Sequence, residues 1–124
     1  MSLFQQGDFT LHSGAMSSFK IDCSVFRRDS IQALAALIAG RFDFGCVEGV
    51  PTGGLALADE LWRASPWFPH GHRGKPLLIV DDVLTTGASM EKQRAGRDAI
   101  GVVVFARGPC PSWVTPIFQM WSET

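Results

Sequence analysis

The chain has 124 residues, a formal net charge of −1 and 46% apolar residues. This length and composition describe one globular domain, and the near-neutral charge argues against nucleic acid as the main partner. The sequence contains no run of 18 apolar residues and no charged segment followed by an apolar one at its start, so we expect no membrane span and no signal peptide. Three widely spaced cysteines predict reduced thiols in a cytoplasmic protein, two of them in the core.

In chain order, the first predicted elements are two short strands, residues 9–11 and 19–22, in which polar and apolar residues alternate. A turn-rich link joins them, so we expect a hairpin that covers one edge of a sheet. A helix should follow from Asp29 or Ser30 to about residue 39. Its apolar residues recur at spacings of three and four, and Gly40 stands at the stop position.

A glycine-rich loop, residues 49–54, follows the next predicted strand, residues 44–48, and leads into an amphipathic helix. Such a loop can present backbone N–H groups in a concave nest that binds an anion. Alternatively, its glycines serve only a tight turn. A third inner strand is predicted over residues 100–105 and a last strand over residues 117–121.

The most informative stretch is residues 77–89, Leu-Leu-Ile-Val-Asp-Asp-Val-Leu-Thr-Thr-Gly-Ala-Ser. Four apolar residues predict a strand buried on both faces, and Asp81 and Asp82 stand where it should end. The loop that follows offers hydroxyls and accessible backbone N–H groups, and Ser89 is a good N-cap for a helix that begins near Met90. Hydroxyls and N–H groups suit a phosphate, whereas paired carboxylates suit vicinal hydroxyls or Mg²⁺. A sugar phosphate with a free diol meets both demands.

Residues 77–89 resemble the thirteen-residue 5-phosphoribosyl-1-pyrophosphate (PRPP) motif of type I phosphoribosyltransferases, and every position fits. The alternative is an ordinary strand–turn–helix that carries the same residues without binding PRPP. The resemblance implies an α/β, three-layer type I phosphoribosyltransferase fold with a mostly parallel central sheet and a reduced N-terminal hood. Residues 1–124 would form a single domain, with a PRPP-binding core at 28–105 and hood and edge elements at 1–27 and 106–124.

The same resemblance implies a Mg²⁺-dependent glycosyltransferase of nucleotide metabolism. It would transfer the 5-phosphoribosyl group from PRPP to a nitrogenous base, orotate-like or another pyrimidine or purine, and release pyrophosphate. Asp81 and Asp82 would be the catalytic residues, which bind the ribose hydroxyls and hold Mg²⁺ directly or through water. The remaining ribose and phosphate site would be Val83, Leu84, Thr85, Thr86, Gly87, Ala88 and Ser89. The pyrophosphate would lie on Val50, Pro51, Thr52, Gly53 and Gly54.

The N-terminal segment is similar to that of orotate phosphoribosyltransferases, because Phe9-Thr-Leu-x-Ser-Gly-x-x-Ser precedes an aromatic residue and Asp22. The chain is therefore closest to the orotate-type members, in shortened form. This likeness implies that Phe19 and Lys20 line the base pocket. His12 stands where that subgroup commonly has Lys, and residues 15–16 are Ala-Met in place of its usual Arg-Lys pair.

The segment before the central strand, residues 65–76, is shorter than in orotate-type relatives, where it carries a mobile cationic loop that reaches the neighbouring subunit. Here His72 and Arg73 are either a remnant of that loop, able to neutralise pyrophosphate, or part of a solvated surface loop. Two functions therefore stay open: a phosphoribosyltransferase, or a catalytically weak or inactive regulatory module that binds PRPP or a nucleotide.

Two tryptophans near the end of the chain, Trp113 and Trp121, form either an apolar wall for a planar base or contacts in the core and in a dimer. The expected partners are PRPP and a nitrogenous base, without nucleic acid or membrane. The family resemblance implies a homodimer.

Overall fold

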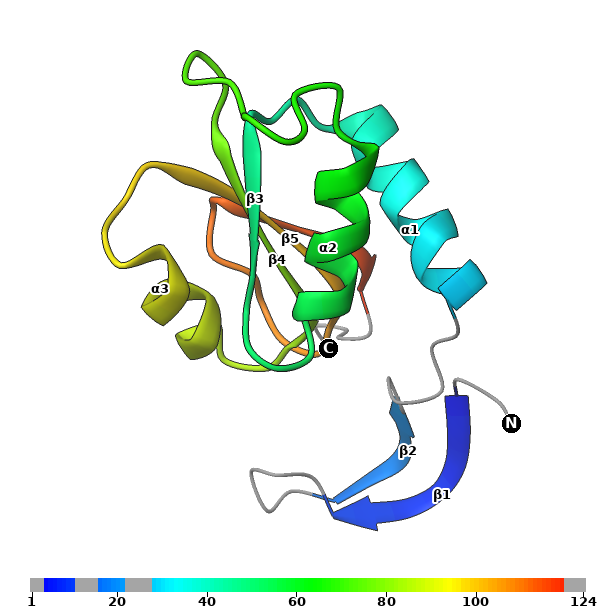
Figure 1. Ribbon diagram of the computed structural model, residues 1–124. Coiled ribbons are helices and arrows are strands. Elements are labelled where there is room, and N and C mark those ends of the chain that lie inside the picture. The colour runs from blue at the N-terminus through cyan, green and yellow to red at the C-terminus, as the bar shows by residue number, and fades with distance from the viewer. Residues whose placement is uncertain (1–3, 11–15, 22–27, 120–124) are drawn as a thin grey trace.

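The computed structural model describes residues 4–10, 16–21 and 28–119. The predicted hairpin comes first, as the antiparallel pair β1 (Phe4–Thr10) and β2 (Met16–Ile21), and it forms a two-stranded sheet of its own (Figure 1). Both strands begin earlier in the chain than predicted, β1 by five residues and β2 by three. The elements that follow are α1 (Arg28–Arg41), β3 (Cys46–Gly49), α2 (Leu55–Ala64), β4 (Leu77–Leu84), α3 (Ala88–Arg94), β5 (Ala99–Ala106) and β6 (Val114–Gln119).

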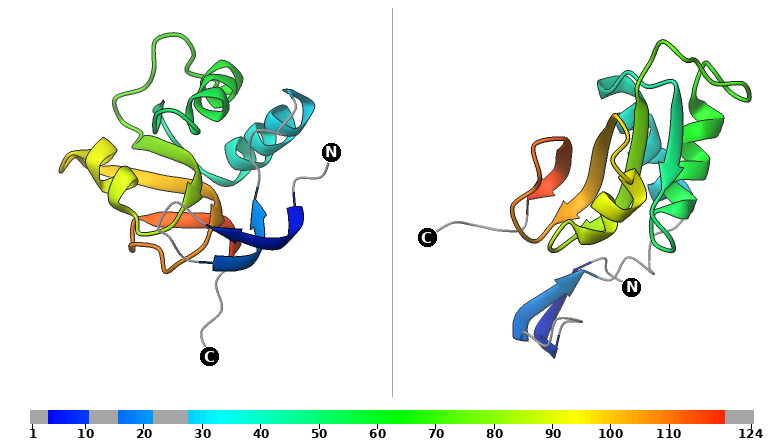
Figure 2. Two further views of the ribbon diagram at one scale, coloured as in Figure 1. Left: turned by 90° about the horizontal axis from the view of Figure 1, so that it is seen from below. Right: turned by 90° about the vertical axis from the view of Figure 1, so that its left-hand side faces the viewer.

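The second sheet is parallel throughout and has the strand order β3-β4-β5-β6. Helices α1 and α2 lie on one face of it and α3 on the other, which makes the predicted three layers (Figures 1 and 2). One core joins α1 and α2 to the sheet through Ile38 and Leu61, and the other joins α3 to the opposite face through Met90. The predicted α/β fold with a parallel central sheet is therefore confirmed.

Strand β4 lies between β3 and β5 and is covered on both faces, so it needs apolar side chains in both directions. Leu78, Ile79 and Val80 are each 0% exposed, in agreement with the predicted buried run. The strand does not end at Val80, however. Its ladder with β5 continues until Leu84 pairs with Ala106, so the two aspartates lie within the strand. Backbone hydrogen bonds with β5 extend β4 past Val80, and the local sequence does not reveal this pairing.

Two predicted helix boundaries are shifted by one or two residues. Helix α1 continues through Gly40 to Arg41. Helix α3 begins at Ala88 with Gly87 as its N-cap, in place of Ser89, because Gly87 adopts a left-handed conformation with φ of 87° that turns the chain from strand to helix. The last strand also begins earlier than predicted, at Val114, and residues 120–121 of the predicted strand lie outside the described residues.

Gly40 provides a test of the boundary of α1. A Cβ at this position would meet no atom within 4 Å, and the helix continues past it. Gly40→Ala should therefore raise the free energy of unfolding by about 0.5–1 kcal/mol, because alanine loses less backbone entropy than glycine on folding. Urea unfolding followed by circular dichroism measures the difference, and a less stable variant would show that the helix ends at Gly40.

The cysteines differ from expectation. Cys46 is exposed and Cys110 is half-buried, while Cys23 lies outside the described residues, so the prediction of two core cysteines is wrong. Within the described ranges, no helix has both the length and the apolar character needed to cross a membrane.

Candidate functional site

Two loops leave the sheet at the same edge. Residues 50–54, here called the glycine loop, follow β3, and residues 85–89, the threonine loop, follow β4 and include the first two residues of α3. Because β3 and β4 are parallel neighbours, both loops lie at the carboxyl ends of their strands, where α/β sheets bind ligands (Figure 1). The amide of Val50 donates to the carbonyl of Val80 at 2.9 Å and fixes the start of the glycine loop on β4.

The glycine loop lies directly on β4. A Cβ added at Gly53 would overlap the carboxylate of Asp82, and one added at Gly54 would overlap the backbone carbonyl of Val80. The peptide bond between Pro51 and Thr52 is cis. Only residues without a side chain permit this approach, so the sequence brings the loop backbone and one of the two aspartates together through its glycines.

The two adjacent aspartates have different surroundings. The amide of Asp82 donates to Asp81 Oδ1, and the amide of Val83 donates to Asp82 Oδ1, both at 2.8 Å. Asp81 is only 7% exposed, whereas the half-buried Asp82 lines a cavity of about 190 Å³ together with Gly53. Their burial differs, so their adjacency in sequence does not make them equivalent. Asp82 is the carboxylate beside the glycine loop.

Burial, with a hydrogen bond to the Asp82 side chain, raises the pKa of Asp81 to about 8. The carboxyl group of Asp81 therefore keeps its proton to a higher pH than an exposed aspartate does.

This raised pKa predicts how stability depends on pH. The Asp81 carboxyl group binds its proton more tightly in the folded chain than in the unfolded one, where its pKa is about 3.8. Its contribution to stability is therefore fully present below about pH 4 and is lost as the pH rises through about 8. Asp81→Asn, which is neutral at every pH, should remove this dependence in urea unfolding measured from pH 5 to 9. The exposed Asp59→Asn should keep the wild-type slope, and an unchanged slope in Asp81→Asn would contradict the assignment.

The threonine loop exposes the side chains of Thr85 and Thr86. The amide of Ala88 donates to Thr86 Oγ1 at 3.3 Å, which shapes the turn into α3. Behind the loop, the segment after β5 approaches closely, because a Cβ at Gly108 would lie 2.6 Å from the carbonyl oxygen of Thr85. The loop thus has a backbone support, and its two threonines are exposed.

One residue near this edge was missed by the sequence reasoning. Arg107 follows β5 directly, and its amide donates to the carbonyl of Leu84 at 2.8 Å, so it lies beside the start of the threonine loop. The sequence could have predicted this position, because Arg107 is a basic residue immediately after a predicted inner parallel strand. In such sheets the carboxyl ends of the strands are where ligands bind.

Trp113 packs on α3. Its Nε1 donates to Glu91 Oε1 at 2.7 Å, and the guanidinium of Arg94 lies 4.6 Å from the centre of its ring. Of the two interpretations of this residue, packing is the one that its contacts favour. Trp121 lies outside the described residues.

The structure does not bring His72 and Arg73 to the two loops of the same chain. The amide of His72 donates to the carbonyl of Gly45, just before β3, and the amide of Gly45 donates to the carbonyl of Pro76, just before β4. Residues 65–76 thus lie at the amino ends of both strands. The length of β4, about 25 Å for its eight residues, separates them from the ligand-binding edge. The side chains of Phe19 and Lys20 lie outside what the structure describes.

Comparison with known proteins places the chain in a family, although no family model matches it. It is 33% identical over 128 residues to an orotate phosphoribosyltransferase of Methanocorpusculum labreanum, an alignment that covers 82% of this chain and 76% of the relative. Among solved structures, orotate phosphoribosyltransferase from Aeropyrum pernix matches 95% of this chain and 88% of its own, with a TM-score of 0.70 and 23% identity.

Two further structures have the same fold. UMP synthase from Leishmania donovani matches with a TM-score of 0.66 and 20% identity, over 95% of this chain and 34% of its own. Orotate phosphoribosyltransferase from Mycobacterium tuberculosis matches with a TM-score of 0.60 and 18% identity, over 94% of this chain and 89% of its own. The identity and coverage of the Methanocorpusculum relative, together with this shared fold, show that the chain belongs to the orotate phosphoribosyltransferase family and is a type I phosphoribosyltransferase.

Proposed function

We propose that the chain transfers the 5-phosphoribosyl group of PRPP to orotate or a related nitrogenous base and releases pyrophosphate. The observation that carries this proposal is the contact between Gly53 and the Asp82 carboxylate. It joins the glycine loop, which is of an anion-binding type, to a carboxylate on β4, and the threonine loop, a second loop of that type, follows the same strand. PRPP carries a phosphate at one end, a pyrophosphate at the other and a diol between, so its groups match the three parts of the site.

The roles follow from that match. Thr85 to Ser89 would bind the 5-phosphate through hydroxyls and backbone N–H groups, and Val50 to Gly54 would bind the pyrophosphate through backbone N–H groups. Asp82, with Asp81 beside it, would accept hydrogen bonds from the ribose hydroxyls. The reaction develops positive charge on the ribose ring, so fixing both ends of PRPP keeps the reacting carbon in place while the leaving group departs.

The aspartate pair also fits a Mg²⁺ ion. Magnesium in phosphate-transfer sites is commonly held by one or two carboxylates, with substrate phosphates and water as its other ligands. Within the described residues no cluster of three or more His, Cys, Asp or Glu side chains could hold a metal. Asp81 and Asp82 would be its protein ligands, directly or through water, and the bound ion would neutralise negative charge on the pyrophosphate.

The remaining assignments concern parts of the chain away from the two loops. Phe19 and Lys20, on the second hairpin strand, would line the base pocket as part of the hood. Because His72 and Arg73 lie at the amino ends of β3 and β4, any charge that they contribute to pyrophosphate would go to a neighbouring copy in a homodimer.

Pyrophosphate release tests the proposal. The chain is incubated with PRPP, Mg²⁺ and one base at a time, with orotate, uracil, cytosine and adenine as the panel. We expect release with orotate above the rate without a base. Absence of release with every base would contradict transferase activity.

The placement of residues 65–76 favours a second candidate, a PRPP-binding regulatory module. Those residues contain His70, His72 and Arg73, and they lie away from the end of the sheet that carries the two loops of their own chain. A protein can still bind PRPP when it no longer stabilises the departing pyrophosphate. Calorimetric binding of PRPP without turnover on any base would support this second function over the first.

A further inference from the structure

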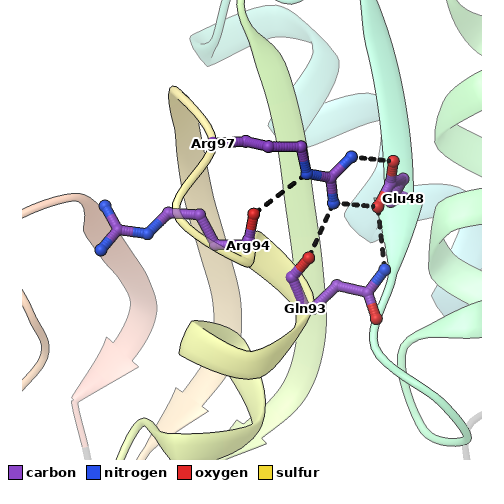
Figure 3. Close-up of polar contacts among 4 residues, drawn as sticks. All are labelled: Glu48, Gln93, Arg94 and Arg97. Carbon is purple, nitrogen blue, oxygen red and sulfur yellow. Dashed lines mark hydrogen bonds and ion pairs between the residues drawn. The ribbon is translucent and has the colours of Figure 1, made fainter.

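A cluster of polar side chains joins strand β3 to the far end of helix α3. The carboxylate of Glu48 accepts two hydrogen bonds from the guanidinium of Arg97, each at 2.8 Å, and a third from Gln93 Nε2, also at 2.8 Å. Figure 3 shows these contacts between β3 on one side and the end of α3 on the other. The paired, two-pronged geometry is the strongest that arginine and carboxylate form.

Arg97 also closes the end of the helix. Its guanidinium donates to the backbone carbonyls of Gln93, at 2.7 Å, and Arg94, at 3.0 Å (Figure 3). Carbonyls in the last turn of a helix have no partner within the helix, and a cation there also interacts favourably with the helix dipole. One guanidinium therefore holds both the end of α3 and the carboxylate on β3.

The two elements that this cluster joins adjoin the two loops, because β3 leads into the glycine loop and α3 follows from the threonine loop. Glu48 stands two residues before Val50, where the glycine loop begins, and α3 begins within the threonine loop. With seven residues, α3 is about 10 Å long, so its ends move together. On its other side, Glu91 of the same helix accepts from Trp113 at 2.7 Å. The helix is thus held from both sides.

We propose that Glu48 is a positioning residue which, through Arg97 and Gln93, sets the spacing between the glycine loop and the threonine loop. It would thereby favour ligands that carry a phosphate group at both ends. A ligand that bridges two subsites gains from the second contact only when the distance between them matches its own length, whereas a ligand of one subsite is insensitive to that distance. This inference rests on the proposed function, because it takes PRPP as the bridging ligand.

Three ligands test the inference by calorimetry in the presence of Mg²⁺. PRPP occupies both loops, ribose 5-phosphate occupies the threonine loop and inorganic pyrophosphate occupies the glycine loop. In Glu48→Ala we expect the Kd of PRPP to rise about tenfold, which is a typical size for the coupling between two sites. The Kd values of ribose 5-phosphate and of inorganic pyrophosphate should change less than about twofold. Unchanged PRPP affinity would overturn the inference. Equal weakening of all three ligands would also overturn it, since that pattern indicates general damage to the loops.

Matched variants separate spacing from stability. Asp59→Asn removes an exposed ion pair with Arg63 within α2, which links no loops, and should leave all three affinities unchanged. Arg97→Lys keeps the charge but not the two-pronged contact, so its PRPP affinity should lie between wild type and Glu48→Ala. Should Glu48→Ala not fold, Glu48→Gln gives the same comparison. A wild-type chain that binds none of the three ligands would contradict the proposed function itself, which is a different result from loss in the variant alone.

Discussion

Asp82→Asn is expected to weaken PRPP binding and lower kcat/KM by about 100-fold. Hydrogen bonds to a charged group contribute about 1.5–3 kcal/mol each, and the carboxylate can accept from both ribose hydroxyls where an amide nitrogen cannot. Asparagine keeps the side-chain oxygen that accepts from the amide of Val83 at 2.8 Å, so the strand should stay intact. Calorimetry with PRPP and pyrophosphate release measure the two effects.

The matched control is Asp59→Asn, which removes a carboxylate of the same type from an exposed position on α2. Its PRPP affinity should equal that of the wild type. Undiminished affinity in Asp82→Asn would show that the carboxylate beside Gly53 does not contact the ligand.

Gly53→Ala is expected to lower kcat/KM by about 100-fold while the chain stays folded. The added methyl group would overlap the Asp82 carboxylate, which must rotate away from the position that the proposal assigns to the diol. A displacement of about 1 Å at a positioned group can cost about a factor of 100 in rate. Steady-state kinetics with PRPP gives the loss, and thermal unfolding should show a melting temperature close to that of the wild type.

Two other glycines provide comparisons for Gly53. At Gly54 the added methyl group would overlap the backbone carbonyl of Val80, which cannot rotate away, so Gly54→Ala should lower the melting temperature as well as activity. Gly40→Ala, whose methyl group meets nothing, should leave kcat/KM unchanged. Full activity in Gly53→Ala would mean that the glycine loop and Asp82 do not form one site.

The local sequence predicted the elements whose character depends on near neighbours. A run of apolar residues at 77–80 predicted a strand covered on both faces, and residues 78–80 are indeed fully buried. The spacing of apolar residues identified α1, and the glycine and threonine loops were found from the small residues that a close backbone approach requires. These features are determined within a few residues along the chain, so the sequence by itself reveals them.

Other features depend on contacts between distant segments. Asp81 and Asp82 are identical neighbours in sequence, and only the packing of β4 buries one and leaves the other beside Gly53. The placement of residues 65–76 at the amino ends of β3 and β4 follows from strand order and direction. Glu48 and Arg97, which are 49 residues apart, meet because α3 packs on the sheet with its far end next to β3. The chain's own sequence thus determined where its two loops and its two aspartates stand along the chain. Tertiary structure decided which side chains meet there, because contacts between distant residues depend on how the strands are ordered.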